Sequence, residues 1–321
     1  MVAMKKVYLQ LLAALLLLFS TSAPAALRVF ACEPEWGALA TELGGPAVSV
    51  YTATTGLQDP HLVEARPSLI AQMRKADLVV CTGGDLEQGW LPLLFQQGGN
   101  SRVQPGGSGY FEAAAFVTLL EVPSRLDRAE GDVHAMGNPH LHLDPRNIAL
   151  VAAGLAKRLA QVDGANAAQY QVRHDDFAKR WTQAIRRWEQ QGASLKGIPI
   201  VTQHKSWSYL SHWLGLREIV TLEPKPGIPP SSAYLSQVLA ELKQKPAKMV
   251  IRAAYQDPRP ARWLAERAGI PAVELPFTVG GSDQAKDLFG LFDDTVARLL
   301  KAVQCAGMEE CRGRQDAGGG Q

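Results

Sequence analysis

The chain has 321 residues, and its 33 lysines and arginines against 31 aspartates and glutamates give a formal net charge of +2. Two of the basic residues lie in a predicted leader, and without them the chain carries 31 charged residues of each sign. This balance argues against a nucleic-acid partner and against a polybasic membrane role. The length suits two domains of ordinary size, each able to bury a core.

Residues 1–25 have the pattern of a secretory signal peptide. Lys5 and Lys6 form a short basic region, residues 7–19 are apolar but too few to span a bilayer, and residues 22–25 end in an Ala-x-Ala cleavage site. A lipoprotein anchor needs a cysteine directly after the apolar stretch, and Cys32 lies too far downstream. We therefore expect an exported, periplasmic protein with a cleaved leader.

Strand and helix patterns alternate through the following hundred residues. Apolar runs predict strands at residues 27–31, 47–51, 76–81 and 116–122, and helical patterns lie at residues 35–43, 68–75 and from Asp85 or Leu86 to about residue 96. The stretch from residue 124 to 138 is polar and is expected to be exposed. Alternation of this kind predicts a parallel α/β sheet with helices on both faces.

A helix start follows at Asp144-Pro145, because aspartate is a good N-cap and proline suits the first helical position. After a break at Asp163-Gly164, residues 165–191 have apolar side chains at spacings of three, four and seven, which predicts one helix roughly 40 Å long. Alternation then resumes, with strands at 198–202, 217–222, 249–251 and 272–275. We predict a signal peptide (1–25), an N-terminal α/β lobe (26–163), a rigid linking helix (164–192), a C-terminal α/β lobe (193–304) and a flexible tail (305–321).

The chain has four cysteines, and pairing is the default expectation in an oxidising compartment. Cys32 and Cys81 each end a predicted strand, so they come within disulfide reach if those strands are neighbours. Cys305 and Cys311 are close enough in sequence to form a disulfide within the tail. A cysteine metal site is the weaker alternative, because the chain has no Cys-x-x-Cys.

Three histidines share one local pattern. His61, His140 and His204 each stand at or just past the end of an extended segment, in a loop that precedes a helix. Loops at this edge of an α/β sheet line the ligand crevice, and neutral imidazole is a common ligand for zinc and related ions. The pattern predicts a metal site that only folding closes. His142 is a further candidate ligand or hydrogen-bonding neighbour, because on an extended chain it would face the same side as His140. His134 could capture or shuttle metal.

The order of these motifs resembles the metal-binding solute-binding proteins of bacterial ABC importers, the zinc and manganese receptor family that includes ZnuA and TroA. The resemblance covers nearly the whole mature chain and is carried by Asp59-Pro60-His61, Asn138-Pro139-His140 with Asp144-Pro145, and Thr202-Gln203-His204 with Tyr209. It implies two α/β lobes bridged by a long helix, with the metal held between them by the three histidines.

The chain departs from the family pattern at the fourth ligand. Many members supply an aspartate from a loop of the C-terminal lobe, and the matching segment, residues 275–281, has no carboxylate. Asp283 and Glu274 flank it, and either of them, a water molecule or an added histidine could complete the site. Zinc accepts three histidines and water, whereas manganese prefers more oxygen ligands, so the departure favours Zn²⁺ over Mn²⁺.

The expected function is capture of Zn²⁺ for an ABC permease of the inner membrane, by a monomer that a periplasmic metallochaperone could load. The same receptor role for Mn²⁺ or Fe²⁺ is the first alternative. A zinc hydrolase with three histidines and an open water position is the second. The chain has no His-Glu-x-x-His and no nucleophile elbow, so we do not expect an enzyme.

Overall fold

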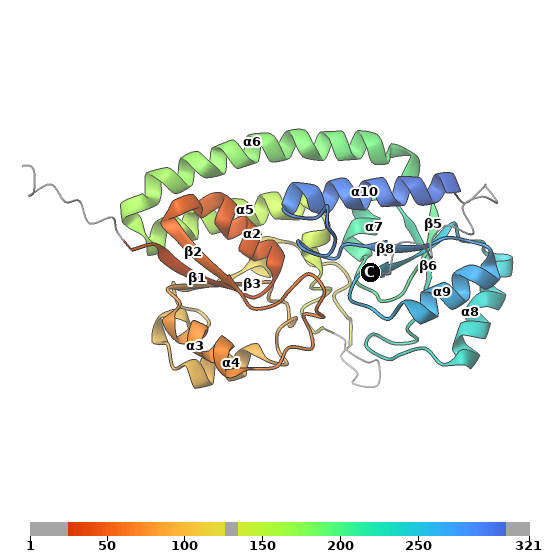
Figure 1. Cartoon of the computed structure of the whole chain (residues 1–321), viewed down its shortest axis with the longest axis horizontal. Coiled ribbons are helices and arrows are strands. Elements are labelled where there is room, and N and C mark those ends of the chain that lie inside the picture. The colour runs from red at the N-terminus through yellow and green to blue at the C-terminus, as the bar shows by residue number, and fades with distance from the viewer. Residues whose placement is uncertain (1–24, 126–133, 306–321) are drawn as a thin grey trace, which may run out of the picture.

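The computed structural model describes residues 25–125 and 134–305, which form two α/β lobes side by side beneath one long helix (Figure 1). Each lobe is built on a four-stranded sheet whose neighbouring strands all pair in parallel. The strand orders, β2-β1-β3-β4 and β6-β5-β7-β8, follow the same topology. The predicted fold class, two parallel-sheet lobes joined by a long helix, is confirmed.

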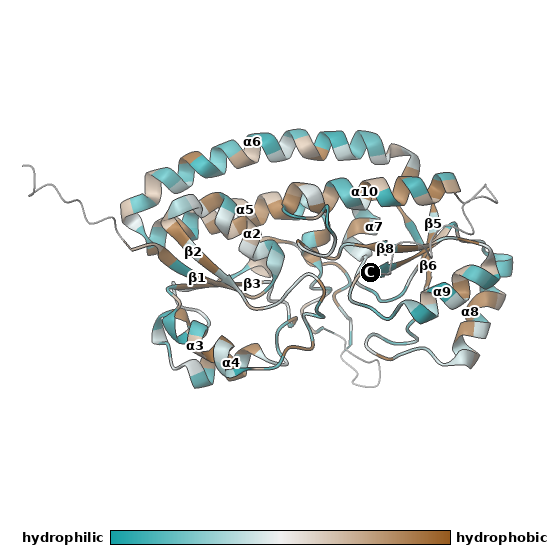
Figure 2. Cartoon of the chain, viewed as in Figure 1, coloured by the Kyte–Doolittle hydropathy of each residue, from teal (hydrophilic) through white to brown (hydrophobic). Residues whose placement is uncertain are grey.

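Alternating side chains of the N-terminal sheet enter two different cores. Val29 and Val80 face a core shared with helices α2 and α5, whereas Phe30 and Val79 face a core shared with α3 and α4. Burial on both faces explains why these strands are continuous apolar runs, which appear as brown bands in Figure 2. The elements of this lobe are β1 (Leu27–Ala31), α2 (Pro34–Gly44), β2 (Val48–Thr52), α3 (Pro67–Lys75), β3 (Leu78–Cys81), α4 (Leu91–Gly98), β4 (Tyr110–Glu112) and α5 (Pro145–Val162).

The C-terminal lobe repeats this arrangement. Val201 and Val250 face helices α8 and α9, and Ile200 and Met249 face the core that contains α7 and α10. Its elements are β5 (Pro199–Thr202), α7 (Ser208–Leu214), β6 (Arg217–Thr221), α8 (Ser232–Gln244), β7 (Met249–Ala253), α9 (Pro258–Ala268), β8 (Ala272–Leu275) and α10 (Leu288–Cys305).

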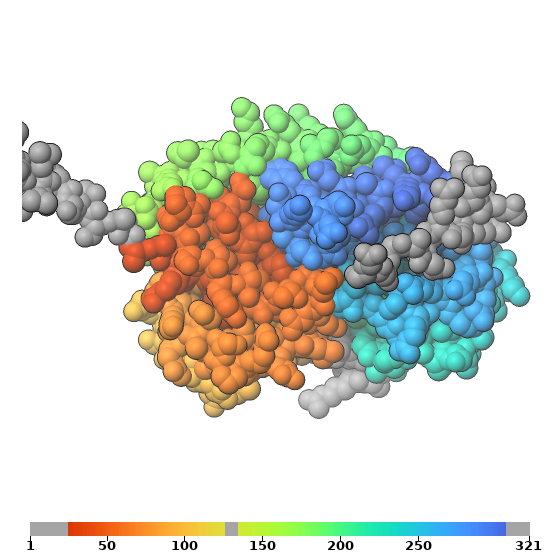
Figure 3. Space-filling model, in the orientation of Figure 1, coloured from red at the N-terminus to blue at the C-terminus, as the bar shows by residue number. Residues whose placement is uncertain are grey.

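Helix α6 (Ala167–Gln191) connects the lobes. It packs on α2 and α5 of the N-terminal lobe and on α10 of the C-terminal lobe (Figure 1). The outer face of α6 is largely hydrophilic (Figure 2). The face toward the protein buries five residues at helical spacing: Tyr170, Phe177, Trp181, Ala184 and Trp188. One core therefore runs without interruption from the first sheet to the second. In Figure 3 the α10 side of the C-terminal lobe (blue) lies directly against the N-terminal lobe (red and orange).

The strand predicted at residues 116–122 is wrong. The fourth strand is β4, six residues earlier, and the segment that follows turns through a short 3₁₀ helix (Ala113–Phe116). The backbone of Leu120 forms its hydrogen bonds with residues distant from it rather than with a neighbouring strand. Its N–H donates to the Tyr209 hydroxyl, and its C=O accepts from the Asn138 N–H. Apolar residues in this segment pack without a strand, because a backbone that is already hydrogen-bonded does not need a ladder.

The helix predicted from Asp85 or Leu86 begins only at Leu91. Asp85 has a positive φ of 72°, which no helix contains, and Glu87 turns its carboxylate back onto the N–H groups of Thr82 and Gly83. Pro92 then lies in the first turn of α4, where its missing N–H costs nothing. The local conformation after β3 is thus a turn closed by a buried carboxylate.

The predicted Cys32–Cys81 disulfide is present and joins the ends of neighbouring strands β1 and β3. Cys305 is also disulfide-bonded, but its expected partner Cys311 lies outside the described residues, as do the proposed leader up to residue 24 and the tail after 305. None of the described helices is both long and apolar enough to cross a membrane.

Candidate metal centre

Three loops bring His61, His140 and His204 together between the lobes. His61 follows β2, His140 lies between β4 and α5, and His204 follows β5 of the other lobe. One ring nitrogen from each lies within 4.8 Å of the others. The ring centroids are 5.3 to 5.9 Å apart. These separations leave room for a single ion bound by three imidazoles.

His61 is oriented by a carboxylate of its own motif. The Asp59 carboxylate lies 2.8 Å from His61 Nδ1 and also accepts the His61 backbone N–H at 3.0 Å. Burial alone would raise the pKa of Asp59, but the hydrogen bonds and charge of His61 outweigh it and hold that pKa below its usual value. An ionised Asp59 keeps the proton of a neutral His61 on Nδ1, so Nε2 is free to bind a metal.

His204 is held in the same way by the other lobe. Its Nδ1 lies 2.6 Å from Oε2 of Glu223, which comes from the loop after β6. The Glu223 carboxylate also accepts the Gly227 backbone N–H at 2.8 Å, which fixes its own position. The His204 Nε2 is therefore the nitrogen left for a ligand.

His140 is the most buried of the three, with 2% of its surface exposed. Its backbone N–H donates to the Asn138 side chain at 3.0 Å, and its Nδ1 is a buried atom with no hydrogen-bond partner in the described part of the chain. Burial, and then the charge that His61 and His204 would carry, lower its pKa well below the ordinary value. His140 is consequently a neutral imidazole, the form that binds metal.

A cavity of about 280 Å³ opens beside these rings. Its lining consists largely of histidines, prolines and polar side chains, and it includes His134, His140, His204, Lys205 and Pro226. His134 reaches the cluster from the segment that precedes Asn138. Its Nε2 lies 3.3 Å from His61 Nε2, and the two rings are stacked.

The structure does not bring the other candidates to the cluster. His142 was expected on the same side as His140, but the chain forms a 3₁₀ helix (Leu141–Leu143) there rather than extended backbone, and the His142 ring points elsewhere. Glu274 is exposed on β8 and paired with Arg252, and Asp283 is exposed in the loop before α10. Neither acid belongs to the group of converging ligand atoms.

His142 instead joins the two lobes behind the site. Its Nε2 donates to the Phe277 carbonyl at 2.9 Å, and its Nδ1 lies 3.2 Å from Glu35 Oε1, close enough for an ion pair but outside hydrogen-bond geometry. The other Glu35 oxygen accepts the Thr278 hydroxyl. The Phe277 ring packs against both His140 and His142. This buried bridge fixes part of the segment at residues 275–281, which has no carboxylate.

The sequence did not predict the roles of Asn138 and Tyr209. Asn138, expected in an exposed stretch, is buried, and its amide donates to the Lys205 carbonyl and to Glu121. The Tyr209 hydroxyl donates to the Asn138 carbonyl at 2.8 Å. The presence of both residues inside the motifs was the available signal, but their contacts join segments about 70 residues apart.

One other group of potential ligands in the described residues lies as close together: Cys32, Cys81 and Glu87. Its two sulfur atoms are joined in the disulfide, so they are not free to bind an ion. The histidine cluster is therefore the candidate site.

Comparison with known proteins places the fold and the family. A family model described as zinc-uptake complex component A, periplasmic, matches residues 29–302. The manganese ABC transporter substrate-binding lipoprotein PsaA of Streptococcus anginosus is 20% identical over 81% of this chain and 83% of its own length. The metal ABC transporter substrate-binding lipoprotein FimA of Streptococcus parasanguinis is 22% identical over 81% and 82%.

Solved structures share the fold. The crystal structure of ZnuA superposes with a TM-score of 0.71 at 22% identity and covers 85% of this chain and 99% of its own. A manganese-bound periplasmic metal-binding protein from Candidatus Liberibacter asiaticus superposes with a TM-score of 0.70 at 15% identity, covering 86% and 99%.

Proposed function

The chain belongs to the family of periplasmic zinc-uptake complex components, and we propose that it captures Zn²⁺ at His61, His140 and His204 for delivery to an ABC importer. At the level of the family, its role is that of the substrate-binding protein of a metal ABC transporter. The convergence of three imidazole nitrogens within 4.8 Å carries the proposal. Two of the rings are oriented by carboxylates, an arrangement typical of histidine ligands of zinc.

The choice of zinc rests on the chemistry of the donors. Three neutral imidazoles suit Zn²⁺, whereas Mn²⁺ favours carboxylate and carbonyl oxygens. The carboxylates nearest the cluster, Asp59 and Glu223, are hydrogen-bonded to ring nitrogens that face away from it. We propose His134 as the fourth ligand, because its Nε2 already lies beside that of His61. The Mn²⁺ and Fe²⁺ receptors remain the alternatives, and some relatives are named for manganese.

The hydrolase alternative has little support. A catalytic zinc needs a general base beside its bound water, and Asp59 and Glu223 are occupied by the rings that they orient. Members of this family are transport proteins rather than enzymes. The partner that we propose is an inner-membrane ABC permease, and loading by a periplasmic metallochaperone fits an exported receptor.

Counting bound metal in histidine variants tests the site. We expect one Zn²⁺ per chain in native mass spectrometry of the wild type, and a large loss of affinity in His61→Ala, His140→Ala and His204→Ala. His174→Ala is the matched control, because His174 lies on α6 away from the cluster. Unchanged affinity in all three variants would remove the proposed site.

A further inference from the structure

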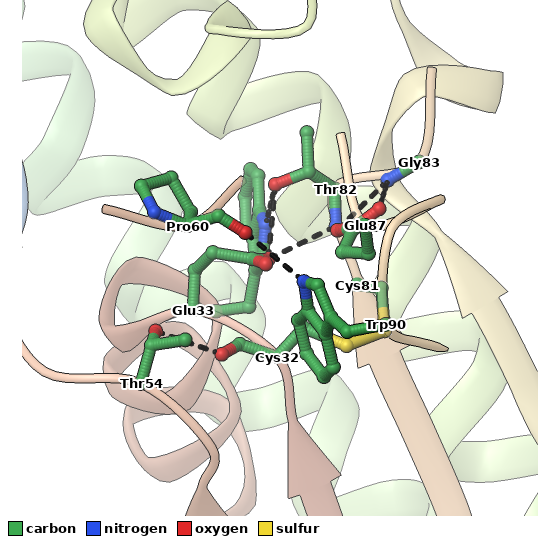
Figure 4. The surroundings of a disulfide bond; sticks show 10 residues. Cys32, Glu33, Thr54, Pro60, Cys81, Thr82, Gly83, Glu87 and Trp90 are labelled. Carbon is green, nitrogen blue, oxygen red and sulfur yellow. Dashed lines mark hydrogen bonds between the residues drawn. A yellow bond between two sulfur atoms is a disulfide. The ribbon is translucent and has the colours of Figure 1, made fainter. Parts of the chain in front are cut away.

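The loop that carries His61 is held from beneath by Trp90, a residue outside the histidine motifs (Figure 4). The Trp90 indole N–H donates to the Pro60 carbonyl at 3.0 Å, one residue before His61. Trp90 is only 1% exposed, so this bond is shielded from water. The proline ring fixes φ at Pro60, and the indole fixes the direction of its carbonyl. The backbone entering His61 therefore has little freedom.

The Cys32–Cys81 disulfide lies in the same buried cluster as Trp90 (Figure 4). Ala53 and Val63, at the two ends of the His61 loop, belong to this cluster as well. The start of the loop is also bonded to the cysteine segment, because the Thr54 hydroxyl donates to the Cys32 carbonyl at 2.9 Å. The disulfide thus joins the end of β3, which leads to Trp90, to Cys32, whose carbonyl the loop contacts.

Hydrogen bonds within the turn from Cys81 to Trp90 hold Trp90 in place relative to the disulfide. The Glu87 carboxylate accepts N–H groups from Thr82 at 2.7 Å and Gly83 at 3.1 Å, and the Trp90 N–H donates to the Glu87 carbonyl at 3.1 Å. A continuous set of bonds therefore runs from the disulfide through this turn to the Pro60 carbonyl. None of these groups belongs to the histidine cluster.

We propose that Trp90 and the Cys32–Cys81 disulfide position His61, so that full metal affinity is reached only after the disulfide has formed. The proposal rests on the function proposed above. Without either anchor the loop samples more conformations, and ordering it on binding reduces affinity although every ligand is still present. Disulfide formation transfers two electrons and two protons from the thiols of Cys32 and Cys81 to an external disulfide oxidant, which is reduced to a dithiol. A chain that still has both thiols binds metal weakly.

Two variants test this coupling by competition against a chromophoric zinc chelator. Trp90→Phe keeps the buried ring but removes the donor, and Cys32→Ala combined with Cys81→Ala removes the disulfide without leaving a thiol. Trp188→Phe is the matched control, since Trp188 is equally buried and its indole donates to Asp293 on α10. We expect the zinc dissociation constant to rise roughly tenfold in both test variants and to stay within twofold in the control.

The melting temperature of the metal-free proteins separates positioning from general destabilisation. Positioning predicts that Trp90→Phe and Trp188→Phe melt at similar temperatures while only the former binds zinc weakly. A Trp90→Phe protein with wild-type affinity, or an equal loss in Trp188→Phe, would overturn the inference and leave the proposed function intact. A wild type that binds no zinc would instead overturn the proposed function, and with it this inference.

Discussion

At the residue scale, two carboxylates decide which nitrogen each half-buried histidine presents. Asp59 and Glu223 both contact an Nδ1, so the Nε2 atoms of His61 and His204 are available. His140 has no such partner, but its burial and lowered pKa keep it neutral. Two rings are thus oriented by carboxylates, and the third is kept in the metal-binding form by burial.

Removing either carboxylate charge should weaken zinc binding without removing a ligand. Asp59→Asn and Glu223→Gln keep the size of the side chains but lose the negative charge that orients the rings and strengthens them as donors. We expect dissociation constants about 10–100-fold higher by chelator competition. Asp175→Asn, on the exposed face of α6, is the control. Affinities equal to the control would mean that the two carboxylates do not support the site.

The convergence of the three histidines could be predicted from sequence, because each stands in a loop after a strand and the motifs occur in a known order. Asp59 lies two residues from its histidine and was visible as part of a motif. Glu223 could not be predicted, since it is 19 residues from His204 and only the pairing of β5 with β6 brings them together. His142 was misplaced, because a single turn of 3₁₀ helix changes the side that its ring faces.

At the scale of elements, strong local signals gave accurate bounds. The strands predicted at residues 27–31 and 272–275 are β1 and β8. Asp144 caps α5 through the Arg146 N–H, as its position before Pro145 indicated. The prediction of a strand at residues 116–122 was wrong, because hydrogen bonds with Tyr209 and Asn138, which are distant in sequence, replace those of a strand.

Glu87, in the turn after β3, and Glu33, at the N-terminus of α2, form a buried acidic pair that should make the stability of the protein depend on pH. Burial raises the pKa of Glu87 to about 7 and that of Glu33 well above its usual range. The folded chain therefore binds a proton that the unfolded chain has released. The stability from protonated Glu87 is complete below about pH 4.5 and is lost as the pH rises to about 7.

Neutralising one member should flatten this dependence. For each proton bound only by the folded state, the free energy of unfolding falls by about 1.4 kcal/mol per pH unit. Denaturant unfolding of the metal-free protein from pH 5 to 7 should show a steeper fall in the wild type than in Glu87→Gln. Glu241→Gln, which removes an acid paired with Lys245 on α8, should retain the wild-type slope. Identical slopes in all three proteins would contradict the uptake of a proton by this acidic pair in the folded state.

At the scale of the whole molecule, the two lobes are built to stay together. One apolar core includes strands of both sheets and the buried face of α6. The Glu35–His142–Thr278 bridge joins the lobes behind the site. Near it Gly56 lies so close to Gly280 that an added Cβ would be 2.3 Å from the Gly280 carbonyl carbon. A shared core and a backbone contact leave little room for hinge motion.

Metal binding should therefore change the overall shape very little. Small-angle scattering of the metal-free and zinc-loaded protein should give radii of gyration within about 1 Å of each other, as expected for a preorganised site. The His140→Ala variant with the same added zinc controls for metal-induced association. A large contraction in the wild type alone would mean that the lobes close on the ion like hinged receptors.

The most direct test of the central claim is competition between metals on the chelator-stripped protein. Zn²⁺ and Mn²⁺ are titrated together at neutral pH, and the bound metal is counted by mass spectrometry. We predict one tightly held zinc ion that excess manganese does not displace, because the converging donors are imidazoles. Preferred binding of manganese, or no tight binding of either metal, would contradict it.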